Sequence, residues 1–292
     1  MKFAYLLLLI GIHGWVQSAE AKWSVTTYNI RNFDRDHDAG RTNLNELGRI
    51  IKEFRSDVIA FEEVVNFDAF DTLIKKNLPG FQYQLSDCGG FGKQHLAVVY
   101  NTRMFEYVHH VEDLSFSGNS SERCGSLRPV LLVTLRHKEN NKIYTFGAVH
   151  LKAGGDDRAF KQRWEQYSKL EKLSRKYAAQ NLILLGDFNT TGYNIQNEDF
   201  EKFEEFIGDA SLRTMTESIG CTNYWQGTLG GPEYQPSILD HIVVQDKHMR
   251  SIESVKVGAH CAKLDCRPAS PTDLGLSYQS VSDHCPLQVT FK

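Results

Sequence analysis

The stretch Leu182-Ile183-Leu184-Leu185-Gly186-Asp187-Phe188-Asn189 decides the fold. Its four consecutive branched aliphatic residues are typical of a β-strand that is buried on both faces. After Gly186 the chain presents a carboxylate, Asp187, and an amide, Asn189. An Asp/Asn turn would account for these two residues equally well. The interpretation therefore depends on whether other strands end in the same way.

The composition is that of an ordinary globular protein. The chain has 292 residues, of which 41% are hydrophobic and 24% charged, so it can form one large domain or two small ones. No low-complexity linker divides it, which favours one domain. The formal net charge is -3, and a protein that holds nucleic acid mainly by counterion release is usually more basic. A nucleic acid partner would therefore be a substrate that is bound briefly.

The N-terminus has the pattern of a secretory signal peptide. A lysine at position 2 precedes an apolar run over 3–12, and small residues follow at Ser18 and Ala21. The run is too short for a permanent membrane helix. We expect residues 1–21 to be removed and residues 22–292 to form the mature domain. The protein would be secreted or periplasmic, and no other apolar run is long enough to predict stable membrane association.

The cysteines indicate disulfide bonds. Six follow the expected signal peptide: Cys88, Cys124, Cys221, Cys261, Cys266 and Cys285. An even number in an exported chain favours disulfides, and the spacing matches no paired zinc motif. Six cysteines allow about 15 pairings. Cys261 with Cys266 is the single pairing that we favour, because both lie in one loop-like stretch; the others stay open.

Hydrophobic periodicity predicts alternating strands and helices. We expect strands at 23–30, 57–61, 81–85, 96–100, 129–135, 143–149, 182–185, 238–244 and 287–291. We expect helices at 44–54, 67–78, 157–177 and 198–206, and a surface loop at 114–125. This order predicts an α/β layered sandwich with mixed sheets.

Polar residues recur where these strands end. They are Asn29, Arg31, Glu63, His150, Asp187, Asn189, Asp240, Asp283 and His284. An oxygen-rich set without thiolates suits Mg²⁺ or Mn²⁺. The histidines add acid–base capacity, with Asp240 a candidate to orient His284. Arg128, at the start of a strand, could clamp an anionic oxygen. Together these groups indicate hydrolysis of a phosphate ester.

Six short motifs carry a resemblance to a known family. They are Tyr28-Asn29-Ile30-Arg31, Ala60-Phe61-Glu62-Glu63-Val64, Ala148-Val149-His150-Leu151, Gly186-Asp187-Phe188-Asn189, Leu239-Asp240-His241-Ile242 and Ser282-Asp283-His284-Cys285-Pro286. In this order the set resembles the endonuclease/exonuclease/phosphatase superfamily, over nearly the whole mature chain. The closest resemblance is to secreted deoxyribonucleases of the pancreatic type.

The resemblance implies a fold and a set of roles. The fold is a four-layer α/β sandwich with two central mixed β-sheets flanked by helices.

Glu63 would be the main metal ligand, with Asn29 and Asp283 lining the metal pocket. Asp187 and Asn189 would orient the attacking water and the phosphate, and Arg31 and Arg128 would bind substrate phosphate. His284, paired with Asp240, would act as base or phosphate contact, and His150 would protonate the leaving oxygen or steady the phosphate.

Two positions depart from the family pattern. Glu62 stands where the family commonly has Gln, and we expect its side chain to lie outside the metal shell or in solvent. Gln94 is the nearest match to a Glu that pairs with the first catalytic histidine, so His150 lacks a charged partner.

The expected function is a secreted, metal-dependent endonuclease that cleaves DNA as a monomer. RNA as a further substrate, the strand preference and a Ca²⁺ ion that holds a loop all stay open. The alternatives are a phosphodiesterase acting on lipid head groups, similar to sphingomyelinases or phosphoinositide phosphatases, and a binding protein that has lost catalysis.

Overall fold

The computed structural model of the chain describes residues 22–34, 41–118, 123–193, 195–227 and 231–292. The expected signal peptide at 1–21 lies outside this part. Within the described residues, no helix has the length and apolar character that a membrane crossing requires.

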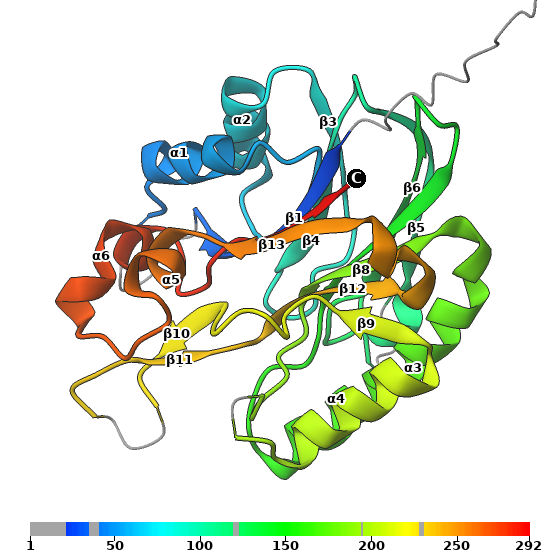
Figure 1. Ribbon diagram of the computed structural model, residues 1–292. Helices are drawn as coiled ribbons and strands as arrows, with labels where there is room; N and C mark the ends of the chain where they lie inside the picture. Colours follow the sequence, from blue (N-terminus) through cyan, green and yellow to red (C-terminus); the bar gives the residue numbers. More distant parts are fainter. Residues whose placement is uncertain (1–21, 35–40, 119–122, 194, 228–230) are drawn as a thin grey trace, which may run out of the picture.

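Two six-stranded sheets form the centre of the molecule (Figure 1). The first sheet has the order β13 (Ile252–Val257), β14 (Leu287–Phe291), β1 (Trp23–Phe33), β2 (Val58–Val64), β4 (His95–Asn101) and β3 (Phe81–Leu85). The second has the order β5 (Phe105–Asp113), β6 (Val130–His137), β7 (Ile143–His150), β8 (Leu182–Asp187), β12 (Asp240–Gln245) and β9 (Leu212–Thr214). Both are mixed, because β1 runs parallel to β2 and β7 parallel to β8 while other neighbours are antiparallel.

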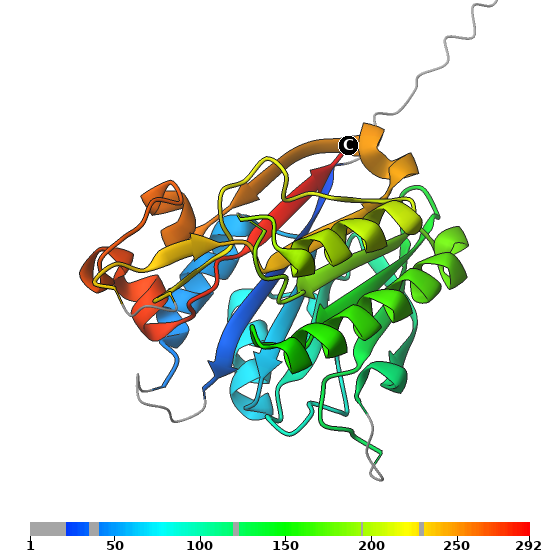
Figure 2. The ribbon, with the colours of Figure 1, turned by 90° about the horizontal axis from the view of Figure 1, so that it is seen from below.

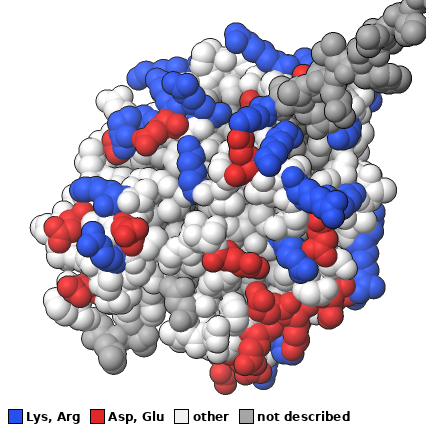
Figure 3. All heavy atoms as spheres, in the orientation of Figure 1, with Lys and Arg blue, Asp and Glu red and all other residues white. Residues whose placement is uncertain are grey.

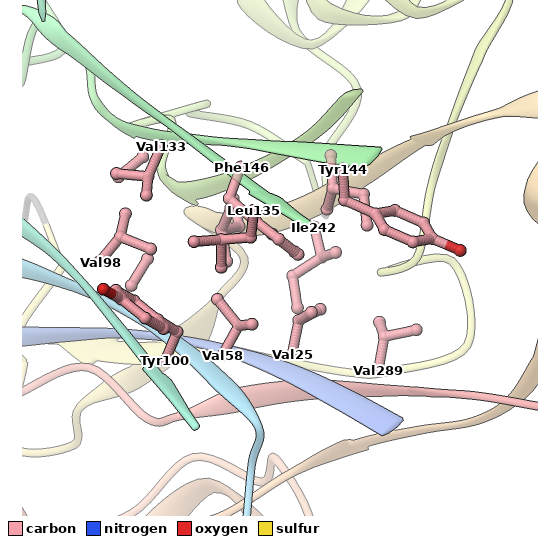
Figure 4. Close-up of a cluster of buried hydrophobic side chains, with 14 of the residues drawn as sticks. Val25, Val58, Val98, Tyr100, Val133, Leu135, Tyr144, Phe146, Ile242 and Val289 are labelled. Atoms are coloured by element: carbon pink, nitrogen blue, oxygen red, sulfur yellow. The ribbon is translucent and has the colours of Figure 1, made fainter. Parts of the chain in front are cut away.

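The sheets pack face to face through a dry core. Side chains from strands of both sheets point toward one another, including Val25, Val58, Val133, Phe146 and Ile242 (Figure 4). β8 lies in the middle of its sheet and is buried over its whole length. This confirms the interpretation of the Leu182 stretch as a strand covered on both faces.

Helices cover the outer face of each sheet. α1 (Leu44–Phe54) and α2 (Phe67–Asn77) pack on the first sheet. α3 (Asp157–Lys176) and α4 (Glu198–Asp209) lie side by side on the second (Figure 2). The expected four-layer α/β sandwich with two central mixed sheets is confirmed.

Several strands and helices were not predicted from the sequence. β5, β9, β13, the hairpin β10 (Asn223–Trp225) with β11 (Gln235–Ser237), and helices α5 (Ala259–Leu264) and α6 (Pro271–Ser280) were not expected. β5 shows no apolar alternation because positions 106–111 are all exposed, and the others are short or polar. The prediction of a surface loop at 114–125 was also partly wrong, since Phe116 is buried in the core beneath α3.

The favoured disulfide pairing was wrong. The bonds join Cys88 to Cys124, Cys221 to Cys266 and Cys261 to Cys285. Cys261 lies in α5, and Cys266 follows just after it. Residues five apart along a helical turn do not face each other, so each finds a partner on a different segment. The Cys261–Cys285 bond thereby ties α5 to the residue that follows His284. The Cys221–Cys266 bond ties the residues after α5 to the segment that precedes β10.

A buried ion pair joins the loops that follow β7 and β8. Arg163 of α3 and Asp199 of α4 are fully buried and form bidentate hydrogen bonds, the shortest at 2.7 Å. Arg163 Nη1 also donates to the carbonyl oxygens of Lys152 and Gly154, at 2.6 and 3.1 Å. Asp199 accepts from the backbone N–H of Thr191 at 2.8 Å. The pair therefore fixes both loops relative to each other.

We predict that Arg163→Met lowers the free energy of unfolding by about 3–5 kcal/mol, because Asp199 would remain buried without its counter-ion. Urea denaturation measures the change. Arg175→Met is the matched control, since Arg175 lies on the same helix and its side chain is 65% exposed; its loss should stay below about 1 kcal/mol. Equal losses in the two variants would contradict the role given to Arg163.

Candidate active site

Three of the expected site residues lie in one row across the second sheet. The parallel register of β7 and β8 pairs His150 with Asp187, and the antiparallel register of β8 and β12 pairs Asp187 with Asp240. Directly paired residues of neighbouring strands point to the same face. Gly186 permits the close pairing, because a Cβ atom there would come within 2.0 Å of the Val149 carbonyl oxygen.

A bulge in the first sheet turns Glu63 toward this row. Regular alternation along β2 would place Glu63 on the same side as Ile59 and Phe61, which pack beneath the helices. Instead the register shifts between Phe61 and Val64, and Glu63 has a φ of 65°. Glu63 Oε2 accepts a hydrogen bond from the backbone N–H of Asn32 at 2.7 Å. Bulges are frequent where a side chain must be re-aimed beside a site.

Asn29 connects the two sheets at this point. Its Nδ2 donates to Glu63 Oε1 at 3.2 Å and to Asp187 Oδ2 at 3.0 Å. Its Oδ1 accepts from the backbone N–H of Arg31 at 3.0 Å. One amide therefore holds a carboxylate from each sheet.

Two imidazoles converge on the same carboxylate oxygen. His150 Nε2 lies 3.5 Å and His284 Nε2 3.9 Å from Asp187 Oδ2. His150 Nε2 is also 3.8 Å from Glu63 Oε1. His284 Nδ1 bonds to Asp240 Oδ2 at 2.8 Å. Residues separated by most of the mature chain thus meet in one buried cluster, which we call the acidic pocket.

Burial opposes the negative charge of the carboxylates at this site. Burial raises the pKa of Asp187 to about 6 and raises the pKa of Glu63. Burial opposes the charge of His284, but the carboxylates of Asp240 and Asp187 prevail and raise its pKa well above the usual range. His284 is therefore a stable imidazolium ion.

The pKa of His150 is shifted in the opposite direction to that of His284. Burial, assisted by the positive charges of Arg128 and His284, lowers its pKa well below the usual range, so the ring is neutral. Its buried Nδ1 has no hydrogen-bond partner among the described residues. Gln94 instead donates to Asn32 Oδ1 at 3.2 Å. The sequence expectation that His150 has no charged partner at that position agrees with this geometry.

Arg128 and Asn189 lie beside His150. Arg128 Nε donates to the His150 carbonyl oxygen at 3.1 Å, and its Nη2 donates to the Leu151 carbonyl oxygen at 2.5 Å. Asn189 Nδ2 donates to the same Leu151 oxygen at 3.2 Å. The two side chains flank the loop that leaves β7, with the guanidinium group at the edge of the acidic pocket.

Arg31 and Asp283 stand apart from the central contacts. Arg31 Nε lies 3.9 Å from Asp283 Oδ1, and Arg31 Nη2 donates to the Gln279 carbonyl oxygen at 3.3 Å. The Asp283 side chain is 34% exposed. The structure therefore places these two residues at the rim, paired with each other.

Glu62 had two expected places, and the structure excludes one of them. The expectation of a side chain in solvent was wrong, because Glu62 is fully buried between the sheets and accepts a hydrogen bond from Thr27 Oγ1 at 2.9 Å. A place outside the metal shell stays a prediction. Burial, then the nearby Asp240, raises the pKa of Glu62 well above the usual range. The neutral form of the side chain is therefore favoured, and in that form Glu62 resembles the uncharged Gln that is common at this position.

Thr222 is a supporting residue that the sequence interpretation missed. Its Oγ1 accepts from the backbone N–H of Leu239 and of Asp240, both at 3.0 Å. Its carbonyl oxygen accepts from the N–H of Cys285 at 2.7 Å. It thus fixes the two backbone segments that carry Asp240 and His284. A lone threonine in a polar stretch gives no sequence signal of this role.

A second group of candidate ligands is structural. His260, Cys261 and Cys285 lie close enough together to share an ion. However, Cys261 and Cys285 are disulfide-bonded to each other and offer no thiolate.

The comparisons with known proteins agree with this geometry. A model of the endonuclease/exonuclease/phosphatase family matches residues 26–284. The chain belongs to this family. A search of curated proteins returned no match.

Solved structures of family members share the fold at low sequence identity. An endonuclease/exonuclease/phosphatase family protein from Bacteroides thetaiotaomicron is 18% identical, with a TM-score of 0.63 over 93% of this chain and 97% of that one. TDP2 from D. rerio, solved with single strand DNA product, is 12% identical, with a TM-score of 0.63 over 94% and 100%. A mannosyl-6-phosphatase from Bacteroides thetaiotaomicron is 18% identical, with a TM-score of 0.61 over 92% and 99%.

The pocket has the donor chemistry for the divalent metal ion on which members of this family generally depend. The carboxylates of Asp187 and Asp240 lie close enough to His284 to share an ion, and Glu63 shares the Asn29 amide with Asp187. Asp240 Oδ1 is buried without a hydrogen-bond partner among the described residues. Burial raises the pKa values of Glu63 and Asp187, and a bound cation would favour their charged forms.

We predict that Glu63→Gln weakens Mn²⁺ binding at least about tenfold, since losing even an outer-shell partner of a metal costs about 10- to 100-fold in affinity. Isothermal titration calorimetry with Mn²⁺ measures the change. Glu53→Gln is the control, because Glu53 is an exposed acid on α1. Unchanged Mn²⁺ affinity in Glu63→Gln would show that Glu63 is not a ligand.

Proposed function

We propose that this family member is a secreted, metal-dependent endonuclease that hydrolyses phosphodiester bonds of DNA by attack of water on phosphorus. The observation that carries the proposal is the meeting of Glu63, Asp187, both imidazoles and Arg128 around one acidic pocket. Such a pocket offers separate groups for a metal ion, a water molecule and a phosphate.

Glu63 is the proposed main metal ligand, and Asn29, whose amide bonds to it, lines the metal pocket. Asp283 would join them after it separates from Arg31. Mg²⁺ and Mn²⁺ suit these oxygen ligands. A divalent cation there would supply positive charge opposite the phosphoryl oxygens and the departing oxygen.

Different side chains of the site would transfer the proton of the attacking water and stabilise the charge on the phosphate. Asp187, with a pKa of about 6, is suited to orient the attacking water and accept its proton near neutral pH. Asn189 lies next to it and positions the phosphate.

His284, kept charged by Asp240, donates a hydrogen bond to a phosphate oxygen, and neutral His150 donates a second. Arg128, and Arg31 when released from Asp283, contact the substrate phosphate.

Other features support export and a nucleic acid substrate. Three disulfide bonds are typical of exported proteins, and we propose that residues 1–21 are a signal peptide preceding a single domain over 22–292. We propose that the protein acts as a monomer. Both charge signs are present on the face shown in Figure 3, with acidic side chains gathered near α4. This suits brief contact with DNA better than tight retention.

We predict that the wild type nicks supercoiled plasmid in Mg²⁺ or Mn²⁺ and stops in excess EDTA. His284→Ala and Asp187→Asn should each lower the rate about 10²- to 10⁴-fold, the contribution usual for acid–base and proton-handling groups. His110→Ala is the control, because His110 is exposed on β5. Agarose gels quantify the nicked form.

The same preparation should be assayed on RNA, sphingomyelin vesicles and mannose 6-phosphate. Hydrolysis of a lipid or sugar phosphate without any plasmid nicking would replace the DNA proposal. Equal nicking by wild type and His284→Ala would remove the proposed site.

A further inference from the structure

A basic hollow lies next to the acidic pocket. It has a volume of about 440 Å³ and is lined by Phe91, residues 126–128, residues 152–153 and the first turn of α3. Arg128 belongs to both places, because it lines the hollow while its guanidinium group bonds to the His150 and Leu151 carbonyl oxygens. A substrate held at the acidic pocket can therefore continue directly into the hollow.

The charge of the hollow is opposite to that of the pocket. Arg128, Lys152 and Arg158 line it, against the single carboxylate of Asp156. That carboxylate is already engaged, because Asp156 Oδ1 caps α3 by accepting from the backbone N–H of Ala159 at 2.8 Å. The hollow therefore favours an anionic group, beyond the phosphate that reacts next door.

The aromatic wall of the hollow is exposed on a braced loop. Phe91 is 79% exposed, the most exposed large hydrophobic residue among those described. Its backbone N–H donates to the Ser126 carbonyl oxygen at 3.2 Å. Gly90, with a φ of 65°, allows this approach, because a Cβ atom there would lie 2.8 Å from the same oxygen. The disulfide between Cys88 and Cys124 ties this loop to the segment that leads to Ser126.

The basic wall is braced as well. The buried Arg163 donates to the carbonyl oxygens of Lys152 and Gly154, which fixes the loop that carries Lys152. Arg158 projects from the first turn of α3 and is exposed. An aromatic ring and cations thus face a shared space from two fixed walls, a combination that binds single-stranded nucleic acid by stacking and charge.

The geometry points to a nucleotide-binding subsite here. The nucleotide next to the scissile phosphate would place its own phosphate against Lys152 and Arg158 and its base against Phe91. This inference rests on the proposed function and deepens it, because a base can stack on Phe91 only when it is unpaired. The enzyme would then prefer single-stranded or frayed DNA over intact duplex and over small phosphate monoesters, which do not reach the hollow.

Binding of a fluorescein-labelled ten-residue oligothymidylate, followed by fluorescence anisotropy in EDTA, tests the subsite without turnover. Phe91→Ala should raise the Kd about 5- to 100-fold, the range for loss of one base–aromatic stack. Arg158→Gln should weaken binding and reduce the slope of log K against log salt by about one. Leu276→Ala and Arg175→Gln are matched controls, since both side chains are exposed and lie outside the hollow.

The outcomes separate the subsite from the proposed reaction. If Phe91→Ala and Arg158→Gln bind the oligothymidylate as the wild type does, while the wild type nicks plasmid, the subsite is wrong and the endonuclease proposal stands. If Phe91→Ala weakens binding of a blunt duplex as much as of the single strand, stacking is not the cause. If the wild type hydrolyses neither plasmid nor bis(p-nitrophenyl) phosphate, the reaction is wrong, and the binding data alone decide the subsite.

Discussion

One amide group holds together the part of the molecule where the two sheets meet. Asn29 Nδ2 donates to Glu63 of the first sheet and to Asp187 of the second. Two carboxylates that repel each other are thereby kept a short distance apart in a buried place. The sandwich core beneath supplies the rigidity, because side chains of both sheets fill the space between them. Gathering two carboxylates and two imidazoles in a buried place favours function over stability.

The surrounding structure limits the electrostatic cost of this arrangement. Glu62 is neutral, and the imidazolium of His284 offsets the charge of Asp240. Thr222 and the disulfide between Cys261 and Cys285 hold the backbone around that ion pair. Burial still raises the pKa values of Glu63 and Asp187 despite these partners, so a divalent cation would stabilise their charged forms.

The acidic pocket and the neighbouring basic hollow would bind different parts of one polyanionic substrate. The acidic pocket is suited to a cation and one reacting phosphate, and the basic hollow beyond Arg128 is suited to a second anionic group and an unpaired base. The buried pair of Arg163 and Asp199 stabilises the loops after β7 and β8 on which both depend. A substrate would then have to be long enough to contact the acidic pocket and the basic hollow at the same time.

The sequence by itself determined the layered α/β fold, the central buried strand at 182–187 and the residues that meet in the pocket, because burial patterns and polar strand ends are local signals. Only the tertiary structure decided how the cysteines pair, that Arg31 lies beside Asp283 and that Glu62 is buried. It also decided that Thr222 bonds to the backbone of Asp240 and that Phe91 lines the basic hollow. These features depend on contacts between segments far apart in the chain and on the bulge that turns Glu63. No local pattern encodes such contacts, since sheet register and loop packing arise only when the whole chain folds.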